Sequence, residues 1–244
     1  MSGHSHAKTI RREKNITDQK RGQMFLKMAR VISVTVKEGG PNPETNSKLR
    51  LAIETARSFN MPNENIERAI KRATGEIPSE KLEEALFEAY GPGGIAIIVE
   101  GITDNKNRTL GEIKQILNQN NGKLVGEGAV KWMFERKGCI VVDSKLQIED
   151  LKNKENLELV SIEAGALDLY WHNDVLDVYT KIEDLERVKK NLEEKEVKID
   201  SSSLDWTAKE EIKLDEKQKE ACQKLFEALD ENEAVQEIYS NLKV

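Results

Sequence analysis

The sequence predicts an α+β protein of three domains, in which a basic three-helix module precedes two α/β modules, one inserted in the other. Three observations predict this class. Residues 1–76 have helical periodicity, the rest of the chain alternates short β-branched runs with amphipathic stretches, and the charge changes sign between the two parts. Residues 1–76 hold 15 Lys and Arg against 8 Asp and Glu, whereas the remainder holds 23 against 36. A cationic module joined to an anionic body predicts one polyanionic partner for the module.

Composition narrows the class of protein further. The chain has 244 residues and a formal net charge of −6. It contains no apolar run near the roughly 20 residues that a membrane span needs, and its first residues lack the apolar segment of a secretory signal. Cys139 and Cys222 lie far apart, which predicts neither a disulfide framework nor a CxxC metal site. We therefore expect a cytoplasmic protein without a membrane partner, metal or cofactor.

The first domain is expected to span residues 1–77. Its first 16 residues are basic and irregular, and the glycines and prolines of 39–43 and of Asn60-Met-Pro62 separate the helices that follow. Pro62 suits the first turn of the third helix, and Gly75 follows its end. The expected helices cover about 18–37, 47–59 and 62–73, with inward stripes of Phe25, Met28, Ala29, Ile32 and Val36, of Leu49, Ala52, Ile53 and Ala56, and of Ile66, Ala69, Ile70 and Ala73.

The central domain is expected to comprise residues 78–136 and 205–244. It opens with a hairpin in which Gly91-Pro-Gly-Gly94 joins two apolar runs, and the second run, Ile95–Val99, has the β-branched character of a strand buried on both faces. Thr109 and Glu112 form a capping-box pattern that predicts a helix from Leu110. The remaining elements are expected to be strands at 129–136, 211–214 and 234–239 and a helix opened by Asp215 and Gln218.

The inserted domain is expected to span residues 137–204. Its predicted order, β-α-β-β-α-β within about 65 residues, is the split-βαβ pattern of ferredoxin-like domains. The strands are expected at 139–142, 167–171, 175–179 and 197–204, and the helices at 144–164 and 180–194, each opened by a capping-box pattern, Ser144 with Gln147 and Thr180 with Glu183.

Motifs along the whole chain resemble those of the YebC/PmpR family. They include Gly3-His-Ser5, Lys20-Arg-Gly22, Gly39-Gly-Pro-Asn-Pro43, Asn46 with Leu49-Arg50, Asn60-Met-Pro62, Asn65–Lys71, Tyr90–Gly94, Thr103–Thr109, Met133–Gly138 and Ala164-Gly-Ala166. The resemblance implies a three-domain protein that acts either as a DNA-binding transcriptional regulator or as a ribosome-associated factor that helps translation. One departure lies at the start, where His6 and Ala7 replace the family's usual Lys-Trp, so a base contact by that tryptophan would be missing here.

The candidate nucleic-acid contacts are the cations of the first domain. Eight of them lie along the arm and the first helix with only Glu13 and Asp18 among them, which is a poor ion-pair pattern and favours a surface that follows phosphates. On the third helix, Glu64 and Glu67 precede cations by four residues, which fits a solvated face about as well as a binding face. The candidates are Lys8, Arg11, Arg12, Lys14, Lys20, Arg21, Lys27, Arg30, Arg50, Arg68, Lys71 and Arg72, with Lys106 and Arg108 as a possible secondary contact.

Other candidate sites have simpler structural interpretations. The glycine turn 91–94 could cradle an anion, but it lacks the Lys-Ser/Thr of a phosphate loop, and a hairpin turn that needs glycine dihedrals is the favoured interpretation. His4 and His6 form a weak metal pattern without a third ligand, and no nucleophile context surrounds any of the three histidines, so no catalytic residue is assigned. Trp132, Trp171 and Trp206 fall in strand patterns and are expected in the core or half-buried.

Three functions therefore compete. The favoured hypothesis is a non-enzymatic, nucleic-acid-binding regulator of gene expression, with DNA and ribosomal RNA as alternative targets. Residues 1–77 show no clear recognition device for an operator, and a basic arm that orders on contact suits structured RNA equally well. A nuclease is disfavoured. An adaptor that binds an acidic protein is the third hypothesis, and competition by heparin or RNA would separate it from the first.

Overall fold

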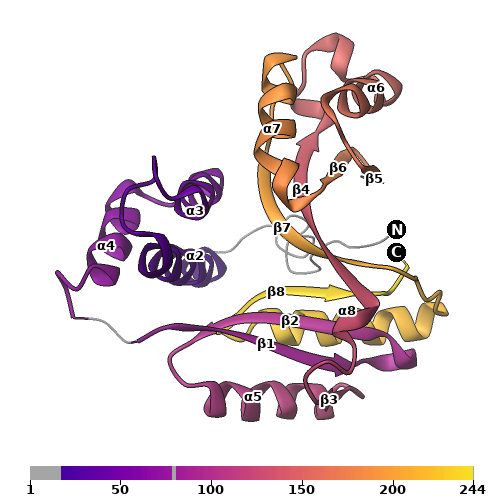
Figure 1. Ribbon diagram of the computed structural model, residues 1–244. Coiled ribbons are helices and arrows are strands. Elements are labelled where there is room, and N and C mark those ends of the chain that lie inside the picture. Colours follow the sequence, from indigo (N-terminus) through magenta and orange to yellow (C-terminus); the bar gives the residue numbers. More distant parts are fainter. Residues whose placement is uncertain (1–17, 79–80, 244) are drawn as a thin grey trace. The chain divides into compact units, whose positions relative to one another are not determined.

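The computed structural model describes residues 18–78 and 81–243, and it divides into two compact units. The first unit comprises the chain up to Glu135 and again from Trp206, and the second unit is Arg136–Asp205 (Figure 1). The mixture of helices with two four-stranded sheets confirms the predicted α+β class. The predicted border at 77/78 falls within the first unit, so the three-domain division stays a prediction.

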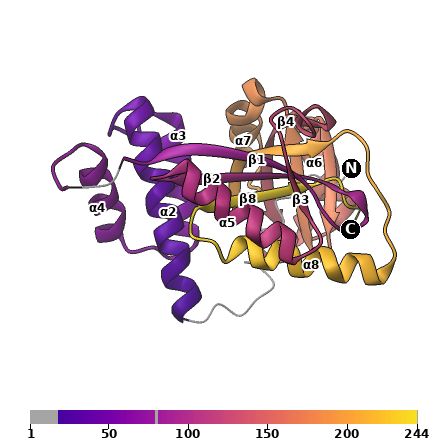
Figure 2. The ribbon, with the colours of Figure 1, turned by 90° about the horizontal axis from the view of Figure 1, so that it is seen from below.

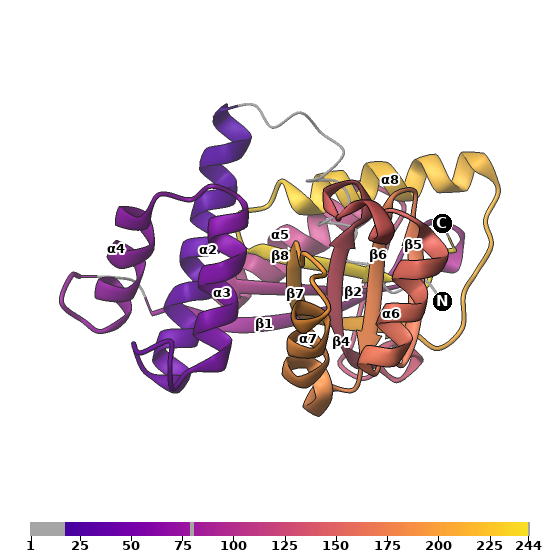
Figure 3. The same ribbon diagram turned by 90° about the horizontal axis from the view of Figure 1, so that it is seen from above.

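Three helices form the N-terminal part of the first unit: α2 (Asp18–Gly39), α3 (Ser47–Ser58) and α4 (Asn63–Ala73). The helix α2 runs alongside both of the others (Figures 1 and 3). Their shared core contains the four predicted inward residues of α3, together with side chains from the other two helices. The core members that decide the packing are Met24, Met28, Ile32, Leu49, Ala52, Ile53, Ala56, Ile66 and Ala69.

One buried side chain fixes the turn between α2 and α3. The amide nitrogen of Asn46 donates to the carbonyl oxygens of Thr35 and Gly40, each at 2.8 Å, and its oxygen accepts from the backbone N–H of Leu49 at 3.1 Å. Asn46 is thus the N-cap of α3 and at the same time ties that helix to the end of α2. A Cβ atom at Gly39 would lie 2.7 Å from the Asn46 side chain, which is why a glycine stands there.

The sheet of the first unit is antiparallel, with strand order β3-β1-β2-β8. Its strands are β1 (Glu83–Tyr90), β2 (Ala96–Thr103), β3 (Lys123–Val125) and β8 (Val235–Ser240), and α5 (Lys106–Gln119) and α8 (Glu216–Asp230) lie on one of its faces (Figures 1 and 2). Side chains of β2 alternate between two cores: Ile97 and Val99 pack with α5 and α8, and Ala96 and Ile98 pack with Phe134 and Tyr239. The strand is therefore buried on both faces, as its β-branched run predicts.

The second unit has strand order β5-β6-β4-β7, which is the ferredoxin-like order that the split-βαβ pattern predicts. Its core lies between one face of the sheet and the two helices, and Ile140, Leu157, Val178 and Val188 are fully buried there. The elements are β4 (Phe134–Asp143), α6 (Lys154–Ala164), β5 (Asp168–His172), β6 (Val175–Thr180), α7 (Leu185–Glu194) and β7 (Ser201–Ala208).

Three of the four predicted capping boxes are wrong, because the capping hydroxyls have other partners. The Thr109 hydroxyl is buried against the Thr103 hydroxyl at 2.8 Å, and α5 begins four residues earlier with Asn105 as its N-cap. The Ser144 and Thr180 hydroxyls donate to the carbonyl oxygens of Asp174 and Lys181. The corresponding helices begin at Lys154 and Leu185, after the 3-10 turns η3 (Ser144–Leu146), η4 (Glu149–Leu151) and η5 (Ile182–Asp184). Only Asp215 and Gln218 form the predicted box.

Other element boundaries also differ from the prediction. The expected strand at 129–136 is a 3-10 turn, η2 (Lys131–Met133), followed by β4, which continues without a break through Gly138. The last strand of the second unit begins at Ser201 rather than at residue 197, and the expected strand at 211–214 is a single bridge between Ile212 and Leu242. The periodicity of apolar residues does not reveal a short turn within an apolar run. This explains the errors in the predicted element boundaries.

A buried carboxylate holds the loop that precedes β4. Glu88, on β1, is 2% exposed and accepts the backbone N–H groups of Gly128, Val130 and Lys131 at 2.6, 2.7 and 2.8 Å. Burial by itself raises the pKa of Glu88, but the three N–H donors and the charge of Lys131 together lower that pKa below its ordinary value. The carboxylate therefore stabilises the folded chain in its ionised form.

Replacement of this carboxylate should change the pH dependence of stability. Because the folded-state pKa lies below the unfolded-state value, the stabilisation is complete above about pH 4.5 and is lost as the pH falls through the folded-state pKa. We expect Glu88→Gln to lower the free energy of unfolding by about 2 kcal/mol at pH 7. Urea unfolding between pH 7 and 3 should show a shallower acid decline for Glu88→Gln than for the unchanged chain. Parallel declines would contradict this role for Glu88.

Candidate nucleic-acid interface

The predicted cations differ in their exposure and contacts, and some of them lie outside the described residues. Lys8, Arg11, Arg12 and Lys14 lie outside the described residues, and of Lys20 only the backbone, within α2, is described. Among the others, Arg21 is exposed on α2 and Arg50 is half-buried on α3.

A groove of about 640 Å³ lies between α2 and α4 and combines an apolar floor with a cationic rim. Phe25, Ala29 and Met61 are among its apolar lining residues. The cations that line it are Arg30 and Lys37 from α2 and Arg68 and Arg72 from α4. Among the described residues that line the groove, none is acidic. Arg30 also pairs with the Glu233 carboxylate, whereas Lys37, Arg68 and Arg72 are exposed, and these three positive charges make the groove a candidate site for a polyanion.

The helix α4 supplies two of the three exposed cations that line this groove. Arg68, Lys71 and Arg72 are all exposed, and Arg68 and Arg72 lie four residues apart, where side chains of one helix face meet. Like charges at this spacing destabilise an isolated helix by roughly 0.2–0.5 kcal/mol. The charge of Lys71 and Arg72 in the last turn is favourable toward the helix dipole, but that effect does not account for Arg68, one turn earlier.

Lys27 does not belong to this surface, which corrects the prediction. Its side chain is only 6% exposed, and its ammonium lies 3.0 Å from a carboxylate oxygen of Asp230 and also donates to the Asp230 carbonyl.

Arg30 both lines the groove and contacts the segment after α8. Its guanidinium donates to the carbonyl of Glu233 at 2.6 Å and pairs with the Glu233 carboxylate at 3.3 Å. These contacts attach α2 to the segment after α8.

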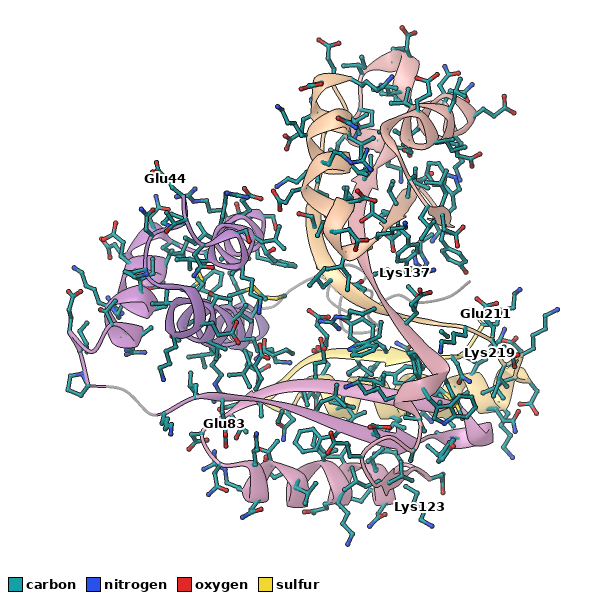
Figure 4. The ribbon with its side chains drawn as sticks, viewed as in Figure 1. Glu44, Glu83, Lys123, Lys137, Glu211 and Lys219 are labelled. Atoms are coloured by element: carbon teal, nitrogen blue, oxygen red, sulfur yellow. The ribbon has the colours of Figure 1, made fainter. Side chains whose placement is uncertain are left out.

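The possible secondary contact at Lys106 and Arg108 is engaged in ion pairs. The Lys106 ammonium lies 3.4 Å from Glu83, at the start of β1 (Figure 4), and Arg108 pairs with Asp104 and lies 3.7 Å from Glu112. Burial raises the pKa of Asp104, but hydrogen bonding and the Arg108 charge lower it overall, so the carboxylate stays ionised beside these cations. An incoming phosphate would have to displace carboxylates here, and we do not include this pair in the interface.

The glycine turn has the geometry of a hairpin connection. The N–H of Gly91 donates to Ile95 and that of Gly94 to Gly91, so both amides are used within the turn. Gly93 has φ +70°, and a Cβ atom there would lie 2.6 Å from Leu214. The turn therefore needs glycine for its dihedrals and for close packing.

Among the described residues, the geometry gives no candidate metal site or catalytic site. His172 lies half-buried on β5 with its Nε2 3.7 Å from Asp177, and burial raises the pKa of the Cys222 thiol to about 11. Within residues 18–78 and 81–243, no three His, Cys, Asp or Glu side chains gather as metal ligands would. None of the helices in the same ranges is both long and apolar enough to cross a bilayer.

Comparison with known proteins places this arrangement in a family. Residues 5–76 match the family model "TACO1/YebC protein N-terminal domain", and residues 82–242 match "TACO1/YebC second and third domain". The chain belongs to the TACO1/YebC family. The resemblance drawn from the motifs is thereby confirmed.

Relatives in this family are similar over their full length. A "Probable transcriptional regulatory protein" of Caldanaerobacter subterraneus is 44% identical, with 100% of this chain and 99% of that protein aligned. One of the same name from Halothermothrix orenii is 42% identical over 100% and 96% of the two chains. The crystal structure of a conserved hypothetical protein from Aquifex aeolicus is 41% identical and has a TM-score of 0.86, covering 93% of this chain and 91% of that one. The names of the first two relatives describe them as probable regulators of transcription.

Proposed function

We propose that this TACO1/YebC-family protein regulates gene expression by binding nucleic acid, without catalysing a reaction, and that the groove between α2 and α4 contacts the sugar–phosphate backbone. The observation that carries the proposal is the group of exposed cations Lys37, Arg68 and Arg72 along one groove, in which the fourth lining cation, Arg30, is paired with Glu233. Backbone phosphates are the polyanion that such a rim fits, and their contacts dominate the affinity of most nucleic-acid-binding proteins.

The groove explains affinity better than it explains sequence specificity. Arginine donates to two phosphate oxygens at once, and the apolar floor can accept a sugar or base that lies between two phosphates. The names of the relatives favour a DNA target and regulation of transcription. Ribosomal RNA presents the same phosphate chemistry, so a translation factor is the alternative that an experiment must separate.

Charge reversal on α4 tests the proposal. We expect Arg68→Glu/Arg72→Glu to weaken binding to DNA and RNA by about tenfold or more at low salt, because both side chains reach phosphates. The matched control is Lys217→Glu/Lys224→Glu, which makes the same change in net charge at two exposed positions of α8. Fluorescence anisotropy with labelled oligonucleotides measures both. Equal losses for the two variants would show that only net charge matters and would contradict the groove.

A sedimentation experiment separates the two targets. Cell extract is fractionated on a sucrose gradient with and without ribonuclease, and the promoter regions of responding genes are footprinted in parallel. A transcriptional regulator should stay out of the ribosomal fractions and protect promoter DNA. Ribonuclease-sensitive comigration with ribosomes, without promoter protection, would instead establish the translation role.

A further inference from the structure

The side chain of Trp132 is the most exposed large apolar group among the described residues. It is 65% exposed, in the 3-10 turn that precedes β4, whereas the sequence predicts a core or half-buried position. Trp171 and Trp206 are half-buried, as expected. Trp171 donates from its indole N–H to Glu158, and Trp206 donates to Glu100. An exposed indole leaves a large flat apolar surface open to a partner, and tryptophan is among the residues enriched at the energetic centres of interfaces.

The exposed ring is held in place by its surroundings. The Trp132 indole N–H donates to the carbonyl of Ala129 at 3.0 Å, and the N–H of Met133 donates to Val130 at 2.9 Å. Three backbone N–H groups of the same loop donate to the Glu88 carboxylate. This buried carboxylate therefore holds the backbone segment that contains Trp132. These contacts restrain the loop and the indole before a partner binds, and such restraint lowers the entropy cost of binding.

The charges around the ring are mixed. The Lys209 ammonium donates to the Trp132 carbonyl at 2.7 Å, and the Lys131 ammonium lies 5.4 Å from the centre of the Trp206 ring. Glu127 and Glu135, close in sequence, are exposed as well. With two lysines against two glutamates, local charge cannot provide strong attraction to an anion. Binding at this position must depend mainly on the flat face of the indole.

We propose that Trp132 is a stacking platform for an unpaired nucleobase. This inference rests on the proposed function and deepens it, because it adds a preference for single-stranded or looped nucleic acid over duplex. Bases stack on exposed aromatic side chains with little regard to sequence, since every base has a π face. Bases within a duplex are already stacked on their neighbours and are not available to the ring.

The test compares one sequence in two forms. A labelled single-stranded RNA of mixed sequence and the same RNA annealed to its complement are titrated with the full chain by fluorescence anisotropy, at low and high salt. We expect Trp132→Ala to weaken single-strand binding about tenfold and duplex binding less than twofold. The tenfold factor should be the same at both salt concentrations, because stacking is not ionic. Leu159→Ala, which removes another exposed apolar side chain from α6, should change neither.

Two further variants keep the test independent of folding. Trp132→Phe should retain most of the single-strand affinity, whereas Trp132→Leu, of similar apolar character but without a flat π face, should lose as much as Trp132→Ala. Single-strand binding that stays within twofold of the unchanged chain in Trp132→Ala would overturn the inference. The proposed function would then still stand if Arg68→Glu/Arg72→Glu weakened binding to both forms. If the unchanged chain bound neither RNA form, the inference would fail, and the same titration with single-stranded and duplex DNA would decide whether the proposed function fails as well.

Discussion

Asn46→Asp is expected to lower the free energy of unfolding of the helical region by about 3–5 kcal/mol. The Asn46 amide donates to two carbonyl oxygens, those of Thr35 and Gly40, at 2.8 Å, and the residue is 5% exposed. An aspartate would place a carboxylate oxygen against both carbonyls, with no proton to share and little access to water. The N-cap hydrogen bond from Leu49 would survive, so the effect isolates the two lost donors.

The chain offers a matched control in the same turn. Asn42 is exposed, and its side-chain oxygen accepts from the N–H of Glu44, a role that aspartate fills equally well. Asn42→Asp should therefore change stability by less than about 0.5 kcal/mol. Hydrogen exchange of the α3 amides, with urea unfolding in parallel, measures both variants. Similar small effects for the two substitutions would show that Asn46 does not hold α3 to α2.

Lys27→Ala is expected to cost about 3–5 kcal/mol of stability, because it leaves Asp230 without the cation that its carboxylate faces at 3.0 Å. A buried ion pair is often replaceable as a pair, so Lys27→Met/Asp230→Leu should recover most of the loss. Urea unfolding of the two single variants and the double variant gives the coupling between the residues.

The same variants show whether Lys27 contacts nucleic acid. The buried position predicts that Lys27→Met/Asp230→Leu, which leaves the net charge unchanged, binds DNA and RNA within about twofold of the unchanged chain. A tenfold loss of affinity in a stably folded double variant would return Lys27 to the interface and would contradict the anchoring role.

The sequence pattern predicts those helices and strands whose structure is determined by residues close together in the chain. The apolar spacing of Leu49, Ala52, Ile53 and Ala56 places all four in the core, because a helix repeats every 3.6 residues whatever lies opposite. The β-branched run of β2 predicts a strand that is buried on both faces, and the structure confirms this prediction. The family follows from motifs spread over the whole chain.

The contacts and positions that depend on residues far apart in the sequence could not be predicted. Lys27 and Arg30 have the spacing of surface cations, but their acidic partners lie 203 residues away in sequence. The capping-box pattern at Thr109 fails because the hydroxyl finds Thr103 instead. Arg68 and Arg72 can be placed on one helix face from their spacing, but only the packing of α4 on α2 brings Lys37 to the same groove. The loop that contains Trp132 is held by Glu88, whose contact with the N–H of Val130 spans 42 residues of sequence.

The salt dependence of binding tests the central claim most directly. The affinity of the full chain for one nucleic acid is measured across a range of salt concentrations, for the unchanged chain and for Arg68→Glu/Arg72→Glu. If the α2–α4 groove holds phosphates, affinity falls steeply as salt rises, and the slope of the logarithmic plot is reduced by about two in the variant. An affinity that does not change with salt, or an identical slope in the variant, would contradict the groove as the nucleic-acid interface.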